Sequence, residues 1–417
     1  MRELREQLLD IRFWQITYDK FMLKSGLSDA DICTISDCFY LNREKIIDEL
    51  LNGAYSWSIP QKVEIAKDGT KKKRVVYVYS IKDRFVLGVL YRSFSNYYSD
   101  RMSPACFSYK MGVSTNDAII YLKDKIEGQS KKGVKIDIHS YFNSVSEEKV
   151  HQMIDELFFD GMKTSIENLM FNNVVWYKGK KIEEWKSLIP GCAFGSLFAN
   201  YCLRECDAYF VDRNKIYARY SDDIIVLEDT DEELQEDLDV IRGYLDRYGL
   251  EINPKKYTWF EENDAFEYLG LKLCGDGKVD ISDHAKKKIK AQIHRWCRKG
   301  RMSIERNGLD FEKVAKSIIR KFNTKNMFCI IDNEAKFGWC HYAFRYLTTI
   351  DSLREIDFYM RDTLRAMKTG KHNKANINAL NDDDFKRLGW VSLVDMYILY
   401  KQDFDYYIEI VELLKNT

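Results

Sequence analysis

The sequence has few of the features that mark secreted or membrane-spanning proteins. Its ten cysteines include no Cys-x-x-Cys pair, and Cys202 and Cys206, one helical turn apart, have no partner pair. This usage is typical of reduced thiols rather than of a disulfide framework. No run approaches the roughly 18 apolar residues of a membrane span, and the N-terminus lacks an apolar signal core. We therefore expect a cytoplasmic protein without a membrane segment.

Zinc ligands, proline and net charge are also scarce. The six histidines show no zinc-ligand spacing, so we predict no zinc site. Only four prolines occur in 417 residues, which leaves few linker signals, while 45% hydrophobic residues suffice for a substantial core in two or three domains. The 65 basic and 65 acidic residues balance. A protein of this composition that binds nucleic acid must segregate its charges.

Two adjacent carboxylates, Asp222 and Asp223, lie between the strand-forming segments 215–220 and 224–227. This pattern predicts a β-hairpin with the acidic pair at its exposed tip. Like charges this close repel each other, and hard carboxylate oxygens suit Mg²⁺ or Mn²⁺, which would relieve the repulsion. Aspartate is also favoured in ordinary surface turns, so that alternative stays open at this point.

A third carboxylate, Asp137, belongs to segment 134–145, which predicts a strand that bends into a helix. Phosphoryl transfer by two metal ions uses a pair of ions about 3.5–4 Å apart. Carboxylates from different strands can bridge such a pair, so Asp137 and the Asp222–Asp223 hairpin could form this site together. A lone aspartate at such a position is otherwise a common helix N-cap.

These residues resemble the palm of reverse transcriptases, in which an Asp-x-x-x-aromatic-aromatic strand faces a Tyr-x-Asp-Asp hairpin. Further blocks resemble the same family, in the expected order, across residues 60–275. They are 67–74 continued by 75–84, then 107–118, 249–256 and 268–271. The resemblance implies an α+β fold of the right-hand polymerase type, with fingers, a palm containing an antiparallel sheet and a helical thumb.

The resemblance points to bacterial members of the superfamily that includes group II intron and retron enzymes. The C-terminal third is most similar to stand-alone reverse transcriptases implicated in phage defence. Its similar segments are 337–344, 352–357, 369–374 and 388–394. Segment 189–200 departs from the family pattern, because it lacks the usual Pro-Gln-Gly-Ser run beside the incoming nucleotide. This departure leaves processivity, fidelity and template choice open.

The resemblance implies roles for individual residues. Asp137, Asp222 and Asp223 are the expected catalytic residues, and with Ile138 they are expected to hold two Mg²⁺ ions, with Mn²⁺ as a possible substitute. The nucleotide is expected to contact Lys67, Arg74, Phe142 and Lys256. Phe142 is expected to exclude a ribose 2′-hydroxyl, and Lys256 to lie near the departing pyrophosphate. Tyr268, Leu269 and Gly270 are expected to support the primer end.

Basic residues concentrate in two segments. Residues 281–321 contain 13 Lys or Arg against 4 Asp or Glu, and residues 61–74 contain 6 against 2. Such stretches neutralise phosphates, and Trp296, Phe311 and Phe322 among them could stack on bases or pack in a core. The expected contacts to nucleic acid are Lys286, Lys287, Lys290, Arg295, Arg298 and Lys371. The acidic segment 228–239 is expected to be a solvated helix face.

The expected domains are an N-terminal helical extension (1–60), fingers (61–133), a palm (134–275) with an excursion at about 143–190, and a helical thumb with a C-terminal extension (276–417). The expected excursion holds helices and a hairpin at 174–182.

Three functions are compatible with the sequence. The first is copying of an RNA template, a structured noncoding RNA from the same locus, into complementary DNA for antiviral defence. The second is template-independent or protein-primed DNA synthesis, and the third is RNA binding of the maturase kind. The expected partners are an RNA template, a DNA product and deoxynucleotides. The template, the primer, the fate of the DNA, the oligomeric state and the trigger stay open.

Overall fold

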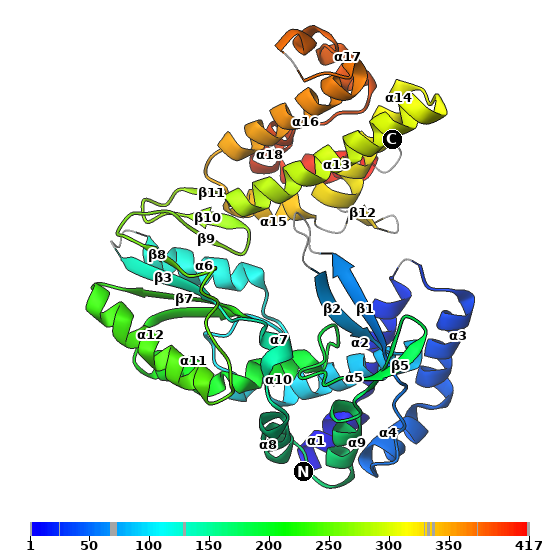
Figure 1. Cartoon of the computed structure of the whole chain (residues 1–417), viewed down its shortest axis with the longest axis vertical. Coiled ribbons are helices and arrows are strands. Elements are labelled where there is room, and N and C mark those ends of the chain that lie inside the picture. The colour runs from blue at the N-terminus through cyan, green and yellow to red at the C-terminus, as the bar shows by residue number, and fades with distance from the viewer. Residues whose placement is uncertain are drawn as a thin grey trace. The chain divides into compact units, whose positions relative to one another are not determined.

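The computed structural model describes residues 2–24, 26–66, 73–127, 131–328, 330–331, 334–335, 338–372 and 374–414. The chain divides into two compact units, Met1–Lys125 with Ser130–Glu262 and Ile126–Gln129 with Asn263–Thr417. The chain combines many helices with largely antiparallel sheets, so the predicted α+β class is confirmed (Figure 1). The predicted domain boundaries stay predictions.

The first unit contains the elements from α1 to β8. Its helices are α1 (Arg2–Leu9), α2 (Ile11–Met22), α3 (Asp29–Ser36), η1 (Asp37–Leu41), α4 (Arg43–Leu51), α5 (Ile81–Tyr97), η2 (Ser99–Arg101), α6 (Thr115–Ile126), α7 (Tyr141–Ser144), α8 (Glu147–Leu157), α9 (Asp160–Met170), α10 (Gly195–Cys202), α11 (Arg204–Asp212) and α12 (Asp231–Asp246). Its strands are β1 (Gln61–Ala66), β2 (Lys73–Val78), β3 (Lys132–Asp137), β4 (Val174–Tyr177), β5 (Lys180–Glu183), β6 (Ile216–Tyr220), β7 (Asp223–Glu228) and β8 (Thr258–Phe260).

The central sheet of this unit has the strand order β6-β7-β3-β8, and every neighbouring pair in it is antiparallel. The inner strands β3 and β7 carry Val134, Ile136 and the run Ile224–Leu227, all of them at most 1% exposed. A continuous apolar run of this length is typical of a strand buried on both faces. Helices α11 and α12 lie along one face of the sheet (Figure 1), and α12 begins at a capping box of Thr230 and Glu233.

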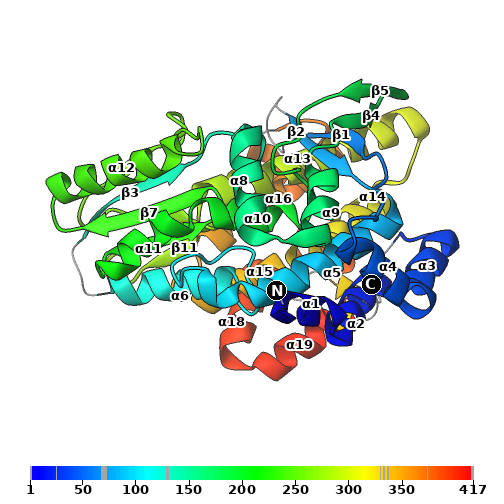
Figure 2. The same cartoon turned by 90° about the horizontal axis from the view of Figure 1, so that it is seen from below.

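A second sheet has the order β2-β1-β4-β5. Hairpin β4–β5 forms where the sequence predicts one, and Gln61 of β1 pairs in parallel with Trp176 of β4. This sheet therefore joins residues 61–78 to part of the excursion at 143–190. Helix α10 lies among α5, α8 and α11 (Figure 2), and its residues from Gly195 to Cys202 are all buried.

The second unit pairs a small sheet with helices. Its strands are β9 (Phe266–Tyr268), β10 (Leu271–Leu273), β11 (Val279–Ile281), β12 (Ile330–Ile331) and β13 (Glu334–Ala335). Its helices are α13 (Asp283–Asn307), α14 (Phe311–Arg320), η3 (Lys321–Met327), α15 (Trp339–Tyr346), α16 (Asp351–Thr369), η4 (Lys374–Asn378), α17 (Asp382–Arg387), α18 (Leu393–Gln402) and α19 (Phe404–Leu413). Ser282 caps the start of α13, and Gly308 ends it with a positive φ.

Two side chains from the acidic and basic segments are buried in the structure. The acidic segment does form α12, but Asp237 in it is 1% exposed and pairs with Lys215 at 2.7 Å, so that residue is not solvated as expected. Phe322 is fully buried against Trp390, which favours core packing over base stacking.

The cysteines among the described residues are free thiols. No described helix is both long and apolar enough to cross a membrane.

Candidate active site

The predicted hairpin is present as strands β6 and β7. Tyr220 pairs with Asp223, so only Ser221 and Asp222 connect the strands. Ser221 has a φ of 60°, a conformation that costs a residue other than glycine about 1–3 kcal/mol. The tip is less exposed than expected, because Ser221 is 5% exposed and the two aspartates are half-buried.

The third carboxylate lies beside this turn. Asp137 ends β3 and pairs across the sheet with Asp223. The next amide, that of Ile138, donates a hydrogen bond to the carbonyl oxygen of Asp222 at 2.9 Å. Asp137 is 4% exposed. Asp137 therefore lies beside Asp222 and Asp223, which follow it by more than 80 residues in the sequence, as the sequence predicted.

The carboxylates repel each other in a partly desolvated site. Burial raises the pKa of Asp222, and the charges of Asp137 and Asp223 raise it further. Burial also raises the pKa of Asp223, against the opposing effect of Lys135, whose Nζ lies 3.8 Å from Oδ1. A cation near the three groups would favour their ionised forms.

The segment after α12 holds Asp137 in place. Asn253 donates from its backbone amide to the Asp137 carbonyl at 2.7 Å and from Nδ2 to Oδ1 at 3.0 Å. Lys256 Nζ lies 2.5 Å from Oδ2. Burial lowers the pKa of Lys256, but its hydrogen bond to Asp137 and the nearby carboxylates outweigh that effect and raise it. The family resemblance predicted a role for Lys256 but not for Asn253, although both belong to the block 249–256.

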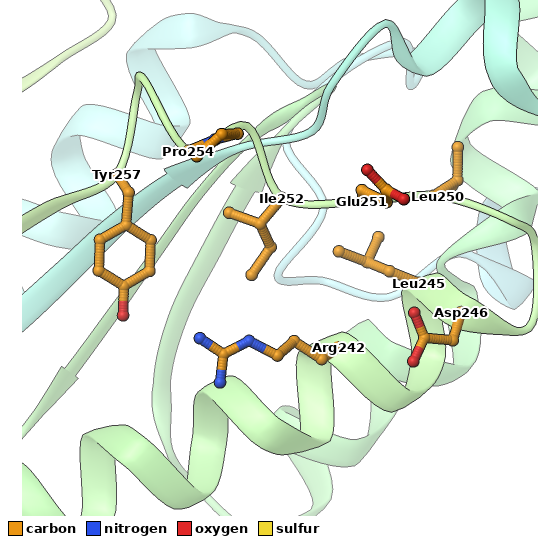
Figure 3. A pocket seen from close by; sticks show the side chains of 8 residues that line it. All are labelled: Arg242, Leu245, Asp246, Leu250, Glu251, Ile252, Pro254 and Tyr257. Atoms are coloured by element: carbon orange, nitrogen blue, oxygen red, sulfur yellow. The ribbon is translucent and has the colours of Figure 1, made fainter.

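The same segment forms one wall of a cavity of about 560 Å³ against α12. Figure 3 shows the side chain of Arg242 directed from the helix toward Ile252 and Tyr257 on the segment. Asn253 and Lys256, by contrast, contact Asp137. The segment that lines the cavity therefore also contacts the acidic site.

The donor set fits a divalent cation in its chemistry. Three carboxylates carry more charge than the nearby Lys135 and Lys256 neutralise, and carboxylate oxygens are the ligands that Mg²⁺ prefers. Within the described ranges, however, no group of three or more His, Cys, Asp or Glu side chains has a geometry that could hold a metal ion. Both Asp137 oxygens instead accept hydrogen bonds from Asn253 and Lys256. Metal binding would require that carboxylate to rearrange.

The expected nucleotide contacts are described in part. Phe142 is half-buried in α7, and its ring meets Tyr109 edge-on, with centroids 6.1 Å apart. Arg74 is exposed on β2, opposite Ile65 of β1. Lys67 lies outside the described residues. Among the expected nucleotide contacts that the structure describes, Lys256 bonds directly to Asp137.

The expected primer-end residues belong to the second unit. Tyr268 ends β9 and pairs with Leu271 of β10, so Leu269 and Gly270 form a two-residue connection. Both have positive φ, 48° and 89°, as a tight hairpin requires. The Leu269 carbonyl accepts a hydrogen bond from the Tyr342 hydroxyl at 3.1 Å. The turn is therefore firmly held within its unit.

The expected nucleic-acid contacts are also in the second unit, and they differ in availability. On α13, Lys286 and Lys290 both pair with Glu355 of α16, at 3.0 and 2.5 Å. Lys287 and Arg298 are exposed on the same helix. Arg295 is half-buried, and Lys371 is exposed after the end of α16.

Comparison with known proteins places this geometry in a family. The family model described as reverse transcriptase (RNA-dependent DNA polymerase) matches residues 65–273, half of the chain. No curated protein matches. Among solved structures, the chain is similar to apo telomerase from Candida tropicalis truncated from its C-terminal domain, with 12% identity and a TM-score of 0.42. That similarity covers 54% of this chain and 55% of the telomerase chain. The family match includes all three aspartates and the strands that carry them, and the chain therefore belongs to the reverse transcriptase family.

Proposed function

We propose that this protein copies an RNA template into complementary DNA in the cytoplasm, and that the template is a structured noncoding RNA from its own locus. We further propose that the product serves in defence against phage. The observation that carries the polymerase function is the pairing of Asp137 with Asp223, with Asp222 in the adjoining turn. The resemblance of the C-terminal third to defence-associated reverse transcriptases supports the biological role.

The side chains of the site suit nucleotidyl transfer. Asp137, Asp222 and Asp223, with the carbonyl of Ile138, would hold two Mg²⁺ ions. When bound, these ions would lower the pKa of the primer 3′-hydroxyl and neutralise charge on the triphosphate. Lys256, whose Nζ lies 2.5 Å from Asp137 Oδ2, would give a proton to the departing pyrophosphate.

Arg74 and Phe142 would determine which nucleotide the site accepts. The planar guanidinium of Arg74, exposed on β2, suits bidentate contact with nucleotide phosphates. The ring of Phe142 would leave no room for a ribose 2′-hydroxyl and offers it no hydrogen bond. Nucleic acid would bind through exposed cations such as Lys287 and Arg298, with an affinity that falls as salt rises.

Sequencing of the RNA and DNA that copurify with the protein tests the function. Wild-type protein should carry DNA complementary to a bound RNA, whereas the Asp222→Asn variant should carry the RNA alone. Asp239→Asn, at an exposed aspartate of α12 that pairs with Arg242, is the matched control and should behave as wild type. Equal amounts of DNA with wild type and Asp222→Asn would contradict the proposal, and RNA without DNA from both would favour a maturase-like role.

Template-independent or protein-primed synthesis is the second candidate. The divergent segment at 191–196 permits it. This segment adjoins hairpin β1–β2, because the Tyr77 amide donates to the Pro190 carbonyl at 2.8 Å and Gly191 lies against Val76. Mass spectrometry of the purified protein distinguishes the two. DNA attached covalently to a tyrosine, with no complementary RNA, would support this candidate over RNA copying.

A further inference from the structure

A network of buried polar side chains lies beneath the turn that joins β6 to β7. At its centre Arg219 of β6 pairs with Asp207 of α11, and their side chains are 0% and 1% exposed. Arg219 donates from Nε to Oδ1 at 2.7 Å and from Nη2 to Oδ2 at 2.5 Å. Burying such a pair adds little net stability, because desolvation offsets the attraction. The groups that the pair contacts are therefore the better guide to its role.

The network reaches the backbone of Ser221 from two sides. On one side, Arg219 Nη1 lies 3.4 Å from the Ser221 carbonyl oxygen. On the other, the Ser221 amide donates to Ser108 Oγ at 2.8 Å. Asn200 of α10 links the two sides, because its Oδ1 accepts from Ser108 Oγ at 3.1 Å and its backbone carbonyl accepts from Arg219 Nη2 at 3.3 Å.

Further hydrogen bonds hold Ser108 and the residues before it to helix α10 and strand β6. Its carbonyl accepts from Asn200 Nδ2 at 2.6 Å. The preceding residues run beside β6, where the Arg219 amide donates to the Ala105 carbonyl at 2.9 Å and the Phe107 amide donates to the Arg219 carbonyl at 2.8 Å. Segment 105–108 therefore lies beside β6, where Cys106 and Arg219 form a β-bridge, and it presents the Ser108 hydroxyl to the turn.

The turn requires this support because of its backbone. Ser221 has a φ of 60°, at the first position of a two-residue hairpin connection where glycine is usual. A residue other than glycine keeps such a conformation only when its surroundings fix it. The next two residues are Asp222 and Asp223, so any relaxation of Ser221 would rotate the peptide that leads into both carboxylates.

We infer that Ser108, Asn200, Asp207 and Arg219 are positioning residues that hold Ser221 in its left-handed conformation and thereby fix where Asp222 and Asp223 point. The inference rests on the proposed function, in that it treats the two aspartates as metal-binding residues of the active site. It assigns a role to segment 105–108 and to the buried ion pair that neither the family match nor the three aspartates specify.

Ser108→Ala is the sharpest variant, because it removes one hydroxyl and leaves the ion pair intact. We expect Mn²⁺ binding, followed by electron paramagnetic resonance, to weaken by about 10- to 100-fold, the range typical of lost outer contacts at metal sites. Amide hydrogen exchange within residues 216–228 should accelerate. Ser165→Ala is the matched control, because Ser165 is also fully buried and donates one hydrogen bond, to the Leu50 carbonyl at 2.8 Å. It should change neither measurement.

Rescue by glycine separates positioning from general packing. Because glycine adopts positive φ without strain, the double variant Ser108→Ala/Ser221→Gly should recover most of the Mn²⁺ affinity that Ser108→Ala loses. Asn200→Ala, which removes the Ser108 partner from the other side, should reproduce the loss. Three results would each overturn the inference. They are unchanged Mn²⁺ binding in Ser108→Ala, a loss equal to that of Ser165→Ala, and no recovery in the double variant.

These measurements do not depend on DNA synthesis. If the wild-type protein makes no DNA while Ser108→Ala still weakens Mn²⁺ binding and glycine restores it, the proposed function fails and the positioning role stands. If DNA synthesis is present and Ser108→Ala changes neither exchange nor metal binding, the positioning role fails and the proposed function stands.

Discussion

The three aspartates of the proposed active site repel one another, and this repulsion lowers the stability of the metal-free protein. Burial and the charges of Asp137 and Asp223 raise the pKa of Asp222 in the folded protein. A group whose folded pKa is raised contributes stability below its unfolded pKa and loses that contribution as pH rises through the folded value. In metal-free protein the repulsion therefore lowers stability above the folded pKa and fades as pH falls toward the ordinary carboxyl range.

Replacing Asp222 should consequently stabilise the metal-free protein while abolishing its chemistry. We expect Asp222→Asn to raise the free energy of unfolding in EDTA at pH 7, because it removes one of three mutually repelling charges. The gain should shrink as pH approaches 4. Urea unfolding at several pH values measures it, with the exposed Asp239→Asn as control. An Asp222→Asn protein less stable than wild type at pH 7 would show that repulsion does not dominate at this site.

Phe142 supports a second prediction at the residue scale. Its half-buried ring packs edge-on against Tyr109, so the ring has a defined position. Phe142→Ala should raise the incorporation of ribonucleotides relative to deoxynucleotides by about tenfold or more, as expected for opening a small steric pocket. Single-nucleotide extension assays measure this ratio. Phe142→Tyr keeps the ring and should keep the discrimination; a Phe142→Ala enzyme that discriminates fully would rule out the steric role.

At the scale of elements, helix α13 shows that a basic segment is not uniformly available to nucleic acid. Lys286 and Lys290 point toward Glu355 and share its charge. Lys287 and Arg298 are exposed. They are eleven residues apart, about three helical turns, and thus lie on one face. Within the described residues neither of them forms an ion pair, whereas Lys286 and Lys290 both pair with Glu355.

The double variant Lys287→Ala/Arg298→Ala should therefore weaken binding to an RNA–DNA duplex and lower the salt slope of log K by about 1.4–1.8, from 0.7–0.9 per phosphate contact. Lys286→Ala/Lys290→Ala, which removes the same number of charges, should have the smaller effect. Fluorescence anisotropy over a range of salt concentrations compares the two. Equal slopes for both variants would mean that the pairing with Glu355 does not persist when nucleic acid binds.

Local sequence pattern predicts those elements that form between neighbouring segments of the chain. The β6–β7 hairpin follows from apolar segments around Ser221–Asp223, and hairpin β4–β5 from residues 174–182. Pairing between distant segments is not encoded in this way. The contact of β1 with β4, the bond from Asn253 to Asp137 and the contact of Ser108 with Ser221 each join residues more than 100 positions apart. The residue pattern and the family resemblance supplied the three aspartates and Lys256, but not Asn253 or Ser108.

At the scale of the whole molecule, the division into two compact units separates the aspartates from the basic helix. Asp137, Asp222 and Asp223 belong to the first unit, and α13 belongs to the second. A ligand stabilises only the folded structure that it binds. Proteins with two units often unfold in more than one transition. A divalent cation bound by the aspartates should therefore act on the two units unequally.

We expect Mn²⁺ at about 100 times its dissociation constant to stabilise the first unit by about 2.7 kcal/mol. The second unit should gain much less. Hydrogen exchange followed by mass spectrometry in increasing urea resolves the units, with residues 132–137 and 223–228 reporting on the first and residues 283–307 on the second. Asp222→Asn should remove the difference, because the cation then loses a principal ligand. An equal gain in both units of the wild-type protein would show that they unfold as one, and a gain confined to the second would place the cation away from the three aspartates.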